Sequence, residues 1–262
     1  MDAFRTIRSG PAITDVAGEL ASRMQLARLT SRYGWAREYC HGKTVLEVAC
    51  GTGQGLSLLS SVGQRVVGGD YSAENLAVAR ATYGSRATLV RFDAQALPIA
   101  TAAMEVILLL ETLYFLPSAD AFMREAVRVL RAGGILLLSV INKDCRDYAP
   151  SESYYWSYGT LELIRLLRQY GFTPQCFGAI PMHRLSLRQR VFRPIKGAAR
   201  HLRLIPRTMQ GRLLLKRLVF GELSPIPSVL TIDSATYEAP VAISHDAPDT
   251  AHQVVLCAAR LG

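Results

Sequence analysis

The sequence predicts an α/β fold in which a mainly parallel sheet is covered by helices on both faces. Apolar runs typical of strands alternate along the chain with segments whose apolar residues recur at helical spacing, which is the pattern of strands joined by helical crossovers. The chain has 262 residues, of which 50% are hydrophobic, so it can bury a full core. The apolar run 45–48 leads into alternating glycines at Gly51, Gly53 and Gly55. A buried strand that meets a ligand at its carboxyl end has this pattern.

The period of the apolar residues places the remaining elements. In the segment 119–130, Phe122, Ala126 and Leu130 fall on one face of a helix and charged residues on the other. Ser72 is a suitable N-cap for the helix that follows it. We expect helices over residues 20–37, 56–62, 73–83, 119–130 and 160–170, and seven strands over 45–48, 64–69, a run beginning at 90, 105–110, 134–141, 173–180 and 253–260.

These elements divide the chain into four expected parts: a helical lid over residues 1–40, an α/β core over 41–181, a basic helical and loop insertion over 182–251, and a last strand over 252–262. The insertion is far longer than a hairpin between the last two strands, and loops of such length are usually functional or disordered. Two helices are expected in it, one over 207–220 and one with a basic stripe of Arg193, Lys196, Arg200 and Arg203.

The net charge of +9 is concentrated in one segment. Residues 163–221 contain 13 lysines and arginines and no acidic residue, whereas the remaining chain has 17 basic and 21 acidic residues. The segment is either a solvated helical hairpin that packs on the sheet, or a surface that attracts an anionic acceptor or an anionic membrane. Nucleic acid ranks last as a partner, because the segment has few aromatic residues to stack on bases.

Cysteine usage indicates the compartment. The five cysteines are odd in number, scattered and without a CxxC pair, so neither a disulfide framework nor a zinc site is expected and no metal is predicted. Residues 1–10 have no apolar core of a signal peptide, and the apolar stretch 97–116 is interrupted by Glu105 and Glu111. We therefore expect a reducing, cytoplasmic location.

Two acidic residues end the strands that follow the glycine-rich turn. Asp70 lies 17 positions after Gly53, where a carboxylate can accept hydrogen bonds from both hydroxyls of a ribose. Asp93 ends the run beginning at Val90, and a carboxylate there can accept the amino group of an adenine ring. Because the carboxyl ends of parallel strands meet at one edge of a sheet, these features predict a site for an adenosyl cofactor.

The motifs VLEVACGTGQG, VVGGDYS and RFDAQALP, in this order, resemble the cofactor motifs of class I S-adenosylmethionine-dependent methyltransferases of the small-molecule type. The resemblance covers roughly residues 32–180. It implies a Rossmann-like sheet of seven strands, with the last strand antiparallel beside the sixth, and S-adenosylmethionine as the cofactor.

The same resemblance implies a role for individual residues. The backbone of residues 49–53 would hold the methionine part of the cofactor, Glu47 would orient its amino group through the loop, Asp70 would hold the ribose and Asp93 would read the adenine. Ala49 stands where the family frequently has glycine, and its methyl side chain is small enough to be tolerated. The expected cofactor contacts are Glu47, Ala49, Gly51, Gly53, Asp70, Tyr71, Asp93, Ala94 and Glu111.

A nicotinamide-dependent dehydrogenase shares the glycine-rich turn and the acidic residue after the second strand. Its fingerprint keeps the spacing GxGxxG, whereas residues 51–55 have GxGxG. Glu47, inside the first strand, would repel a pyrophosphate but suits a ligand with a sulfonium and an ammonium group. The sequence therefore favours S-adenosylmethionine over NAD.

Methyl transfer from a sulfonium is an in-line displacement, so the protein mainly aligns the reacting atoms. A hydroxyl acceptor must also lose its proton, and a carboxylate or imidazole beyond the carboxyl ends of the strands can take it. Glu111, after the fourth strand, is the first candidate base, although it would equally suit backbone N–H groups at the following turn. His183, after the sixth strand, is the second candidate. Tyr33, Tyr114, Asn142 and Tyr155 are expected to contact the acceptor.

Residues 111–114 lack the Asn/Asp-Pro-Pro-Tyr/Phe sequence of families that methylate amides and base amino groups. We therefore expect O-methylation of a small-molecule, saccharide or lipid-linked acceptor. The alternative is a binding or scaffold protein that keeps the cofactor fold and docks on an anionic membrane or partner through its basic insertion.

Overall fold

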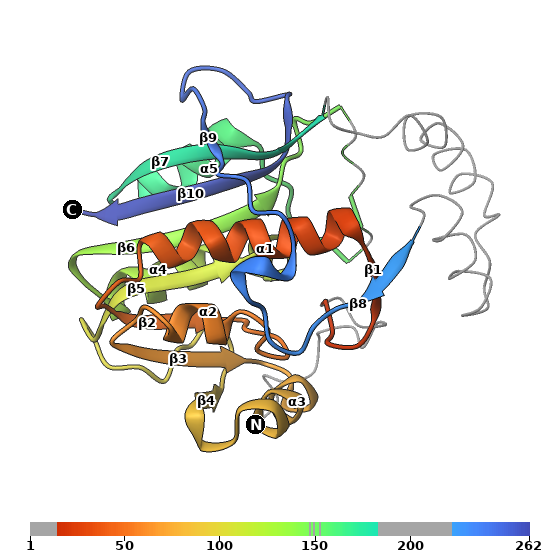
Figure 1. Cartoon of the computed structure of the whole chain (residues 1–262). Helices are drawn as coiled ribbons and strands as arrows, with labels where there is room; N and C mark the ends of the chain where they lie inside the picture. Colours follow the sequence, from red (N-terminus) through yellow and green to blue (C-terminus); the bar gives the residue numbers. More distant parts are fainter. Residues whose placement is uncertain (1–14, 147, 149, 152, 183–221) are drawn as a thin grey trace.

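Eight strands form the central sheet of the protein, in the order β4-β3-β2-β5-β6-β10-β7-β9 (Figure 1). The computed structural model describes residues 15–146, 148, 150–151, 153–182 and 222–262. The strands of the sheet are β2 (Thr44–Val48), β3 (Arg65–Asp70), β4 (Thr88–Arg91), β5 (Met104–Leu110), β6 (Leu130–Ile141), β7 (Phe172–Pro181), β9 (Val241–Ala242) and β10 (His252–Leu261).

The strand directions give the sheet one functional edge. β4, β3, β2, β5 and β6 run parallel to one another. β10 lies between β6 and β7 and is antiparallel to both, so the predicted antiparallel last strand is confirmed. Because the five neighbouring strands are parallel, their carboxyl ends meet at one edge, where open α/β sheets bind ligands.

Three short strands have no signal in the sequence. β9 pairs with β7 and makes the central sheet eight-stranded, which corrects the expected count of seven. β1 (Leu20–Ser22) and β8 (Leu223–Pro225) pair in a separate two-stranded sheet. Segments of two or three residues are too short for a period-2 pattern, so the sequence cannot reveal them.

Helices cover both faces of the sheet. α1 (Arg23–Glu38) and α2 (Leu56–Ser60) lie on one face, and α4 (Ala119–Val129) and α5 (Thr160–Gln169) lie on the other (Figure 1). α3 (Ala73–Tyr83) packs against β3 and β4. The five α-helices of the described residues are all predicted, with ends that differ by up to three residues.

Helix α1 begins at Arg23, three residues after its expected start, for a local reason. Residues 20–22 pair with β8 as a strand, and the Ser22 hydroxyl then accepts a hydrogen bond from the N–H of Gln25. The Gln25 side chain in turn accepts a hydrogen bond from the N–H of Ser22. This reciprocal pair is a capping box, which satisfies two backbone donors at the start of the helix.

Strand β5 separates two hydrophobic cores. Its residues Val106 and Leu108 are buried with Leu29 and Trp35 of α1, whereas Ile107 and Leu109 pack in the core that contains α4 and α5. A parallel strand that is buried on both faces is apolar throughout rather than alternating. This explains the continuous apolar run of β5.

The disulfide between Cys176 of β7 and Cys257 of β10 corrects the expectation that the cysteines do not pair. The two residues are 81 positions apart in the sequence and directly opposite each other in the antiparallel register. No spacing rule reveals such a pair before the register is known. The disulfide also removes the argument for a reducing compartment, so a cytoplasmic location stays a prediction.

Two further expectations concern the membrane and the insertion. Among the described helices, none is long and apolar enough to cross a membrane. Residues 183–221, which include His183 and both expected helices of the insertion, lie outside the described residues.

Candidate cofactor and acceptor site

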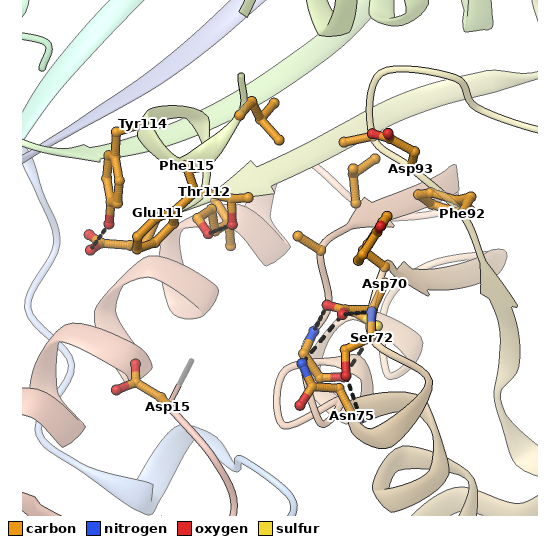
Figure 2. Close-up of a pocket in the computed structure, with 18 of the residues that line it drawn as sticks. Asp15, Asp70, Ser72, Asn75, Phe92, Asp93, Glu111, Thr112, Tyr114 and Phe115 are labelled. Carbon is orange, nitrogen blue, oxygen red and sulfur yellow. Dashed lines mark hydrogen bonds between the residues drawn. The ribbon is translucent and has the colours of Figure 1, made fainter. Parts of the chain in front are cut away.

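A cavity of about 790 Å³ opens at the carboxyl ends of β2, β3 and β5 (Figure 2). Its walls are the turns that follow these strands, the loop after β4, one side of α1 and the ring of Tyr154. Cavities for small molecules typically measure about 300–1,000 Å³. The cavity is lined by nine of the residues that the sequence predicts: Tyr33, Ala49, Gly51, Asp70, Tyr71, Asp93, Ala94, Glu111 and Tyr114.

The turn after β2 is built from residues with positive φ. Gly51 has φ of 60° and Gly53 has φ of 82°, values that glycine adopts without strain. A Cβ at Gly53 would lie 3.1 Å from the Tyr83 ring, so this position also needs glycine for space. Ala49 has φ of 59°, which costs a residue with a Cβ roughly 1–2 kcal/mol. The difficulty at Ala49 is therefore its backbone conformation rather than the size of its methyl group.

Asp70, at the end of β3, ties two backbone segments together (Figure 2). One carboxylate oxygen accepts the N–H of Gly51 at 2.8 Å, and the other accepts the N–H of Ser72 at 2.8 Å and the amide of Asn75 at 3.3 Å. A carboxylate has about four acceptor positions, so about one remains for a ligand hydroxyl. Asp70 thus shapes the glycine turn in addition to any contact with a ribose.

The part of the cavity next to Asp70 is a slot lined by Tyr71, Phe92, Asp93 and Ala94. The Phe92 ring covers Gly69, where a Cβ would be 2.0 Å from a ring carbon, so glycine is required for this contact. Asp93 accepts the N–H of Gln95 at 2.8 Å, which fixes its carboxylate beside this ring. The slot therefore combines apolar walls with one fixed carboxylate, as an adenine ring requires.

Glu47 is buried in β2, behind the glycine turn, and only 2% of it is exposed. One carboxylate oxygen accepts the Tyr33 hydroxyl at 2.5 Å, and the other has no hydrogen-bond partner. Burial raises the pKa of Glu47 from 4.5 to about 7, although the Tyr33 hydrogen bond and the charge of Arg32 oppose this. Burial and the neighbouring Glu47 hold the pKa of Tyr33 well above its usual value, so its hydroxyl keeps its proton.

Tyr33 has a different position from the one expected for an acceptor contact. Its ring lines the cavity and covers Gly55, where a Cβ would be 1.9 Å from a ring carbon. Its hydroxyl points to Glu47 and is used there. Tyr33 therefore supports the glycine turn from beneath.

Glu111 directly follows β5 and lies on the opposite side of the cavity from Asp70 (Figure 2). Its φ of 54° is another left-handed value at a residue with a side chain, and such strain is often found at functional sites. Its backbone N–H donates to the carbonyl oxygen of Ser139 at 2.9 Å. The Tyr114 hydroxyl donates to a Glu111 carboxylate oxygen at 3.0 Å. Burial and Glu111 hold the pKa of Tyr114 well above its usual value, so Tyr114 stays a donor.

Three aromatic rings form the wall beside Glu111. Tyr114 and Tyr154 have ring centroids 4.4 Å apart, and Phe115 packs edge-on against both at 4.8 and 5.1 Å. All three rings line the cavity. Tyr154, rather than the expected Tyr155, provides the third ring, because Tyr155 is 51% exposed and does not line the cavity.

Residues of α1 in the cavity wall are missing from the sequence prediction. Gln25, Arg28 and Arg32 line the cavity, and Arg32 pairs with Asp15 at 3.3 Å. Their spacing of three and four positions places them on one face of a helix, beside the buried stripe that includes Leu29. This spacing is visible in the sequence and could have identified them.

Besides Tyr155, three predicted residues do not line the cavity. Asn142 is fully buried, and its amide donates to the carbonyl oxygens of Asp249 and His252 at 2.6 and 2.9 Å, so it holds two chain segments together. Gly53 and Glu47 lie behind the cavity lining. His183 lies outside the described residues.

Comparison with known proteins agrees with this geometry. A profile described as a methyltransferase domain matches residues 46–138. The chain is 33% identical over 137 residues to a probable S-adenosylmethionine-dependent methyltransferase of Mycolicibacterium smegmatis, covering 51% of this chain and 53% of that protein. It is 29% identical over 117 residues to the ubiquinone biosynthesis O-methyltransferase of Sinorhizobium medicae, covering 44% and 47%. The chain thus spans about half the length of these curated relatives.

A solved structure supports the same fold. The S-adenosylmethionine-dependent methyltransferase from Thermotoga maritima aligns over 92% of both chains with a TM-score of 0.58 and 16% identity.

The residues of the cavity fit S-adenosylmethionine, the cofactor for which these relatives are named. Asp70 and Asp93 supply carboxylates next to an apolar slot. Glu47 has a buried oxygen without a partner behind the turn, and the buried Arg32 Nε has no partner either. Arg32 lines the cavity and suits the carboxylate end of the cofactor, whereas Glu47 lies behind the turn and would orient the ammonium end only through the loop. Residues 46–138 of this chain therefore match a methyltransferase domain, and its α/β core has the fold of S-adenosylmethionine-dependent methyltransferases.

Proposed function

We propose that the protein transfers the methyl group of S-adenosylmethionine to an oxygen atom of a small-molecule acceptor. The observation that carries the proposal is the position of Glu111, which faces the same cavity as Asp70 and Asp93 and lies beside three aromatic rings. A proton acceptor at this place is what a hydroxyl nucleophile requires. The relationship to an O-methyltransferase from Sinorhizobium medicae supports the choice of oxygen.

The bound cofactor supplies an electrophilic methyl group on a sulfonium. The residues of the chain have three tasks around it. Asp70 and Asp93 would hold the ribose and the adenine, while the glycine turn would hold the methionine part. Glu111 would accept the hydroxyl proton while the oxygen–carbon bond forms and the electron pair of the breaking carbon–sulfur bond returns to sulfur. The wall of Tyr114, Phe115 and Tyr154 would exclude water from the acceptor and orient it.

The substitution Glu111→Gln tests the role of the carboxylate. The variant keeps the volume and the acceptor oxygen of the side chain but cannot take a proton. We expect kcat to fall by about 10²- to 10⁴-fold and the acidic limb of the kcat–pH profile to disappear. The affinity for S-adenosylhomocysteine should stay nearly the same, because glutamine keeps a side-chain oxygen for any contact with the cofactor.

Acceptors for this measurement come from a metabolite extract incubated with methyl-labelled S-adenosylmethionine. Glu105→Gln is the matched control, because Glu105 lies at the other end of β5 and bonds to Thr44 and Lys43 outside the cavity. An unchanged rate together with an unchanged pH profile for Glu111→Gln would assign Glu111 to the structure of the turn.

A second candidate function rests on the basic residues 163–221. Their 13 positive charges without an acidic residue support a role in docking on an anionic membrane or partner, with the cofactor domain as a binding module. Methyl transfer to any acceptor would exclude a binding module that docks without catalysing a reaction. Peripheral docking and catalysis are compatible with each other.

A further inference from the structure

Arg28 is an arginine of the cavity wall with unused hydrogen-bonding capacity. Its side chain is 25% exposed, and its single ion pair joins Nη2 to the Glu111 carboxylate at 3.8 Å. This distance is too long for a hydrogen bond. Within the described residues, the guanidinium donates no hydrogen bond, although it carries five donors.

Two other arginines have closer partners than Arg28. Arg128 donates to the carboxylate of Glu125 and to the carbonyl oxygens of Leu97 and Ile99, all at 2.7–2.9 Å. Arg32, one turn further along α1, pairs with Asp15 at 3.3 Å and lies 5.7 Å from the centre of the Tyr33 ring. Among the residues that the structure describes, Arg28 has no such partners, and none of them uses its donors.

The surroundings of Arg28 belong to the acceptor side of the cavity. Its charge acts on Tyr114 and Tyr154, and it faces Glu111. Arg32 instead lies next to Tyr33, which contacts Glu47 and covers Gly55. Arg32 therefore lies beside the glycine turn, although Glu111 and Tyr114 also act on its charge, and Arg28 is the guanidinium that pairs with the candidate base.

We propose that Arg28 binds an anionic group of the methyl acceptor, a carboxylate or a phosphate, and that the acceptor is a hydroxylated compound with such a group next to a planar or apolar body. The planar guanidinium matches both anions with two parallel hydrogen bonds. The aromatic wall of Tyr114, Phe115 and Tyr154 suits the rest of such a molecule. The inference rests on the proposed function, since it names the class of acceptor for the same site.

Binding of the anion also changes the partners of the Glu111 carboxylate. The loose Arg28–Glu111 pair of 3.8 Å is exchanged for a direct pair between Arg28 and the acceptor. Glu111 then keeps the Tyr114 hydroxyl at 3.0 Å and has its remaining acceptor positions available for the hydroxyl proton. An anionic acceptor thus leaves the Glu111 carboxylate ready to take the hydroxyl proton, because the acceptor itself pairs with the Arg28 guanidinium.

Calorimetry with the protein saturated with S-adenosylhomocysteine tests this without the need for turnover. The probes are two matched pairs, 3,4-dihydroxybenzoate with its methyl ester, and glucose 6-phosphate with glucose. We expect at least one anion to bind about 10- to 100-fold more tightly than its neutral partner. Arg28→Gln should remove this difference, and Arg28→Lys should restore part of it, because an ammonium has the charge without the planar fork.

Arg23→Gln is the control on the same helix, because Arg23 does not line this cavity and its side chain is 85% exposed. It should preserve the preference for the anion. The proposal is overturned if the anion and its neutral partner bind alike, or if neither binds. It is also overturned if Arg28→Gln lowers the affinity for S-adenosylhomocysteine instead, because this would assign Arg28 to cofactor binding. Absence of methyl transfer with anion binding intact would contradict the proposed function and leave this inference in place.

Discussion

Burial of Glu47 gives the stability of the protein a pH dependence. Its carboxyl is buried in β2, and burial raises its pKa from 4.5 to about 7. The folded protein therefore holds a proton that the unfolded chain releases above pH 4.5. A raised pKa contributes stability that is present below the unfolded value and is lost as the pH rises through the folded value. Glu47 thus stabilises the fold less at pH 8 than at pH 5.

We expect the free energy of unfolding of the ligand-free protein to fall between pH 5 and pH 8, with up to about 3 kcal/mol of the decrease due to Glu47. Glu47→Gln should remove this part of the slope, because a glutamine does not titrate. Urea denaturation at a series of pH values measures it, with the exposed Glu19→Gln as the control. Equal slopes for the Glu47→Gln and wild-type proteins would contradict the assignment.

The residues of the site differ in how far the sequence reveals them. Asp70, Asp93 and Glu111 were predictable because each lies at or just after the end of a strand, and strand ends meet at one edge of a parallel sheet. Arg28 and Arg32 come from a helix expected only as a lid, so their contribution to the wall depends on how the helix packs. The opposite case is Asn142, which follows a strand but turns its amide into the protein.

At the scale of elements, α1 combines two roles. Leu26, Leu29 and Trp35 pack in the core on one face of the sheet, while Arg28 and Arg32 line the cavity. The expected lid is therefore also a packing helix. The two roles coexist because adjacent faces of one helix point to the core and to the cavity.

Helix α4 offers a test of the start signals on which the element predictions depend. The Ser118 hydroxyl accepts the N–H of Ala121 at 3.1 Å, and the Ser118 N–H donates to Gln95 beside Asp93. Ser118→Ala removes only the first of these bonds. We expect a loss of about 1 kcal/mol, or a decrease in Tm of about 2–4 °C.

Calorimetric unfolding measures this decrease. Ser60→Ala at an exposed position of α2 is the control and should leave Tm nearly unchanged. A similar Tm for Ser118→Ala and the wild type would show that the cap contributes nothing to α4.

For the whole molecule, the order of strands and helices follows from the alternation of apolar patterns, and the positions of all seven predicted strands agree with the structure to within a few residues. The eighth strand, the β1–β8 pair and the Cys176–Cys257 disulfide do not follow from local patterns. Each of them joins segments that are distant in the sequence, so it cannot be identified before the strand pairing is known.

The uneven charge is a further property of the whole chain. If residues 163–221 attract an anionic surface, binding must weaken as salt shortens the Debye length from about 10 Å at 0.1 M to about 3 Å at 1 M. We expect the protein to sediment with phosphatidylglycerol vesicles at low salt and not with phosphatidylcholine vesicles. Changing Arg193, Lys196, Arg200 and Arg203 to glutamate should mimic high salt.

The matched control is the same change at Arg65, Arg80, Arg131 and Arg260, which are exposed in the core domain. It should retain most of the vesicle binding. Vesicle binding that is absent, or that responds equally to both sets of changes, would reject the basic segment as a docking surface.

Titration calorimetry with S-adenosylhomocysteine and NAD, on the wild type and on Asp93→Asn, is the most direct test that the cavity is a site for S-adenosylmethionine. Asparagine can keep the oxygen that accepts the Gln95 N–H but loses the carboxylate that faces the slot. This assignment of the cavity predicts one S-adenosylhomocysteine per chain, no heat with NAD, and a roughly 10- to 100-fold weaker affinity for S-adenosylhomocysteine in Asp93→Asn. Binding of NAD without S-adenosylhomocysteine, or an Asp93→Asn variant that binds as tightly as the wild type, would contradict it.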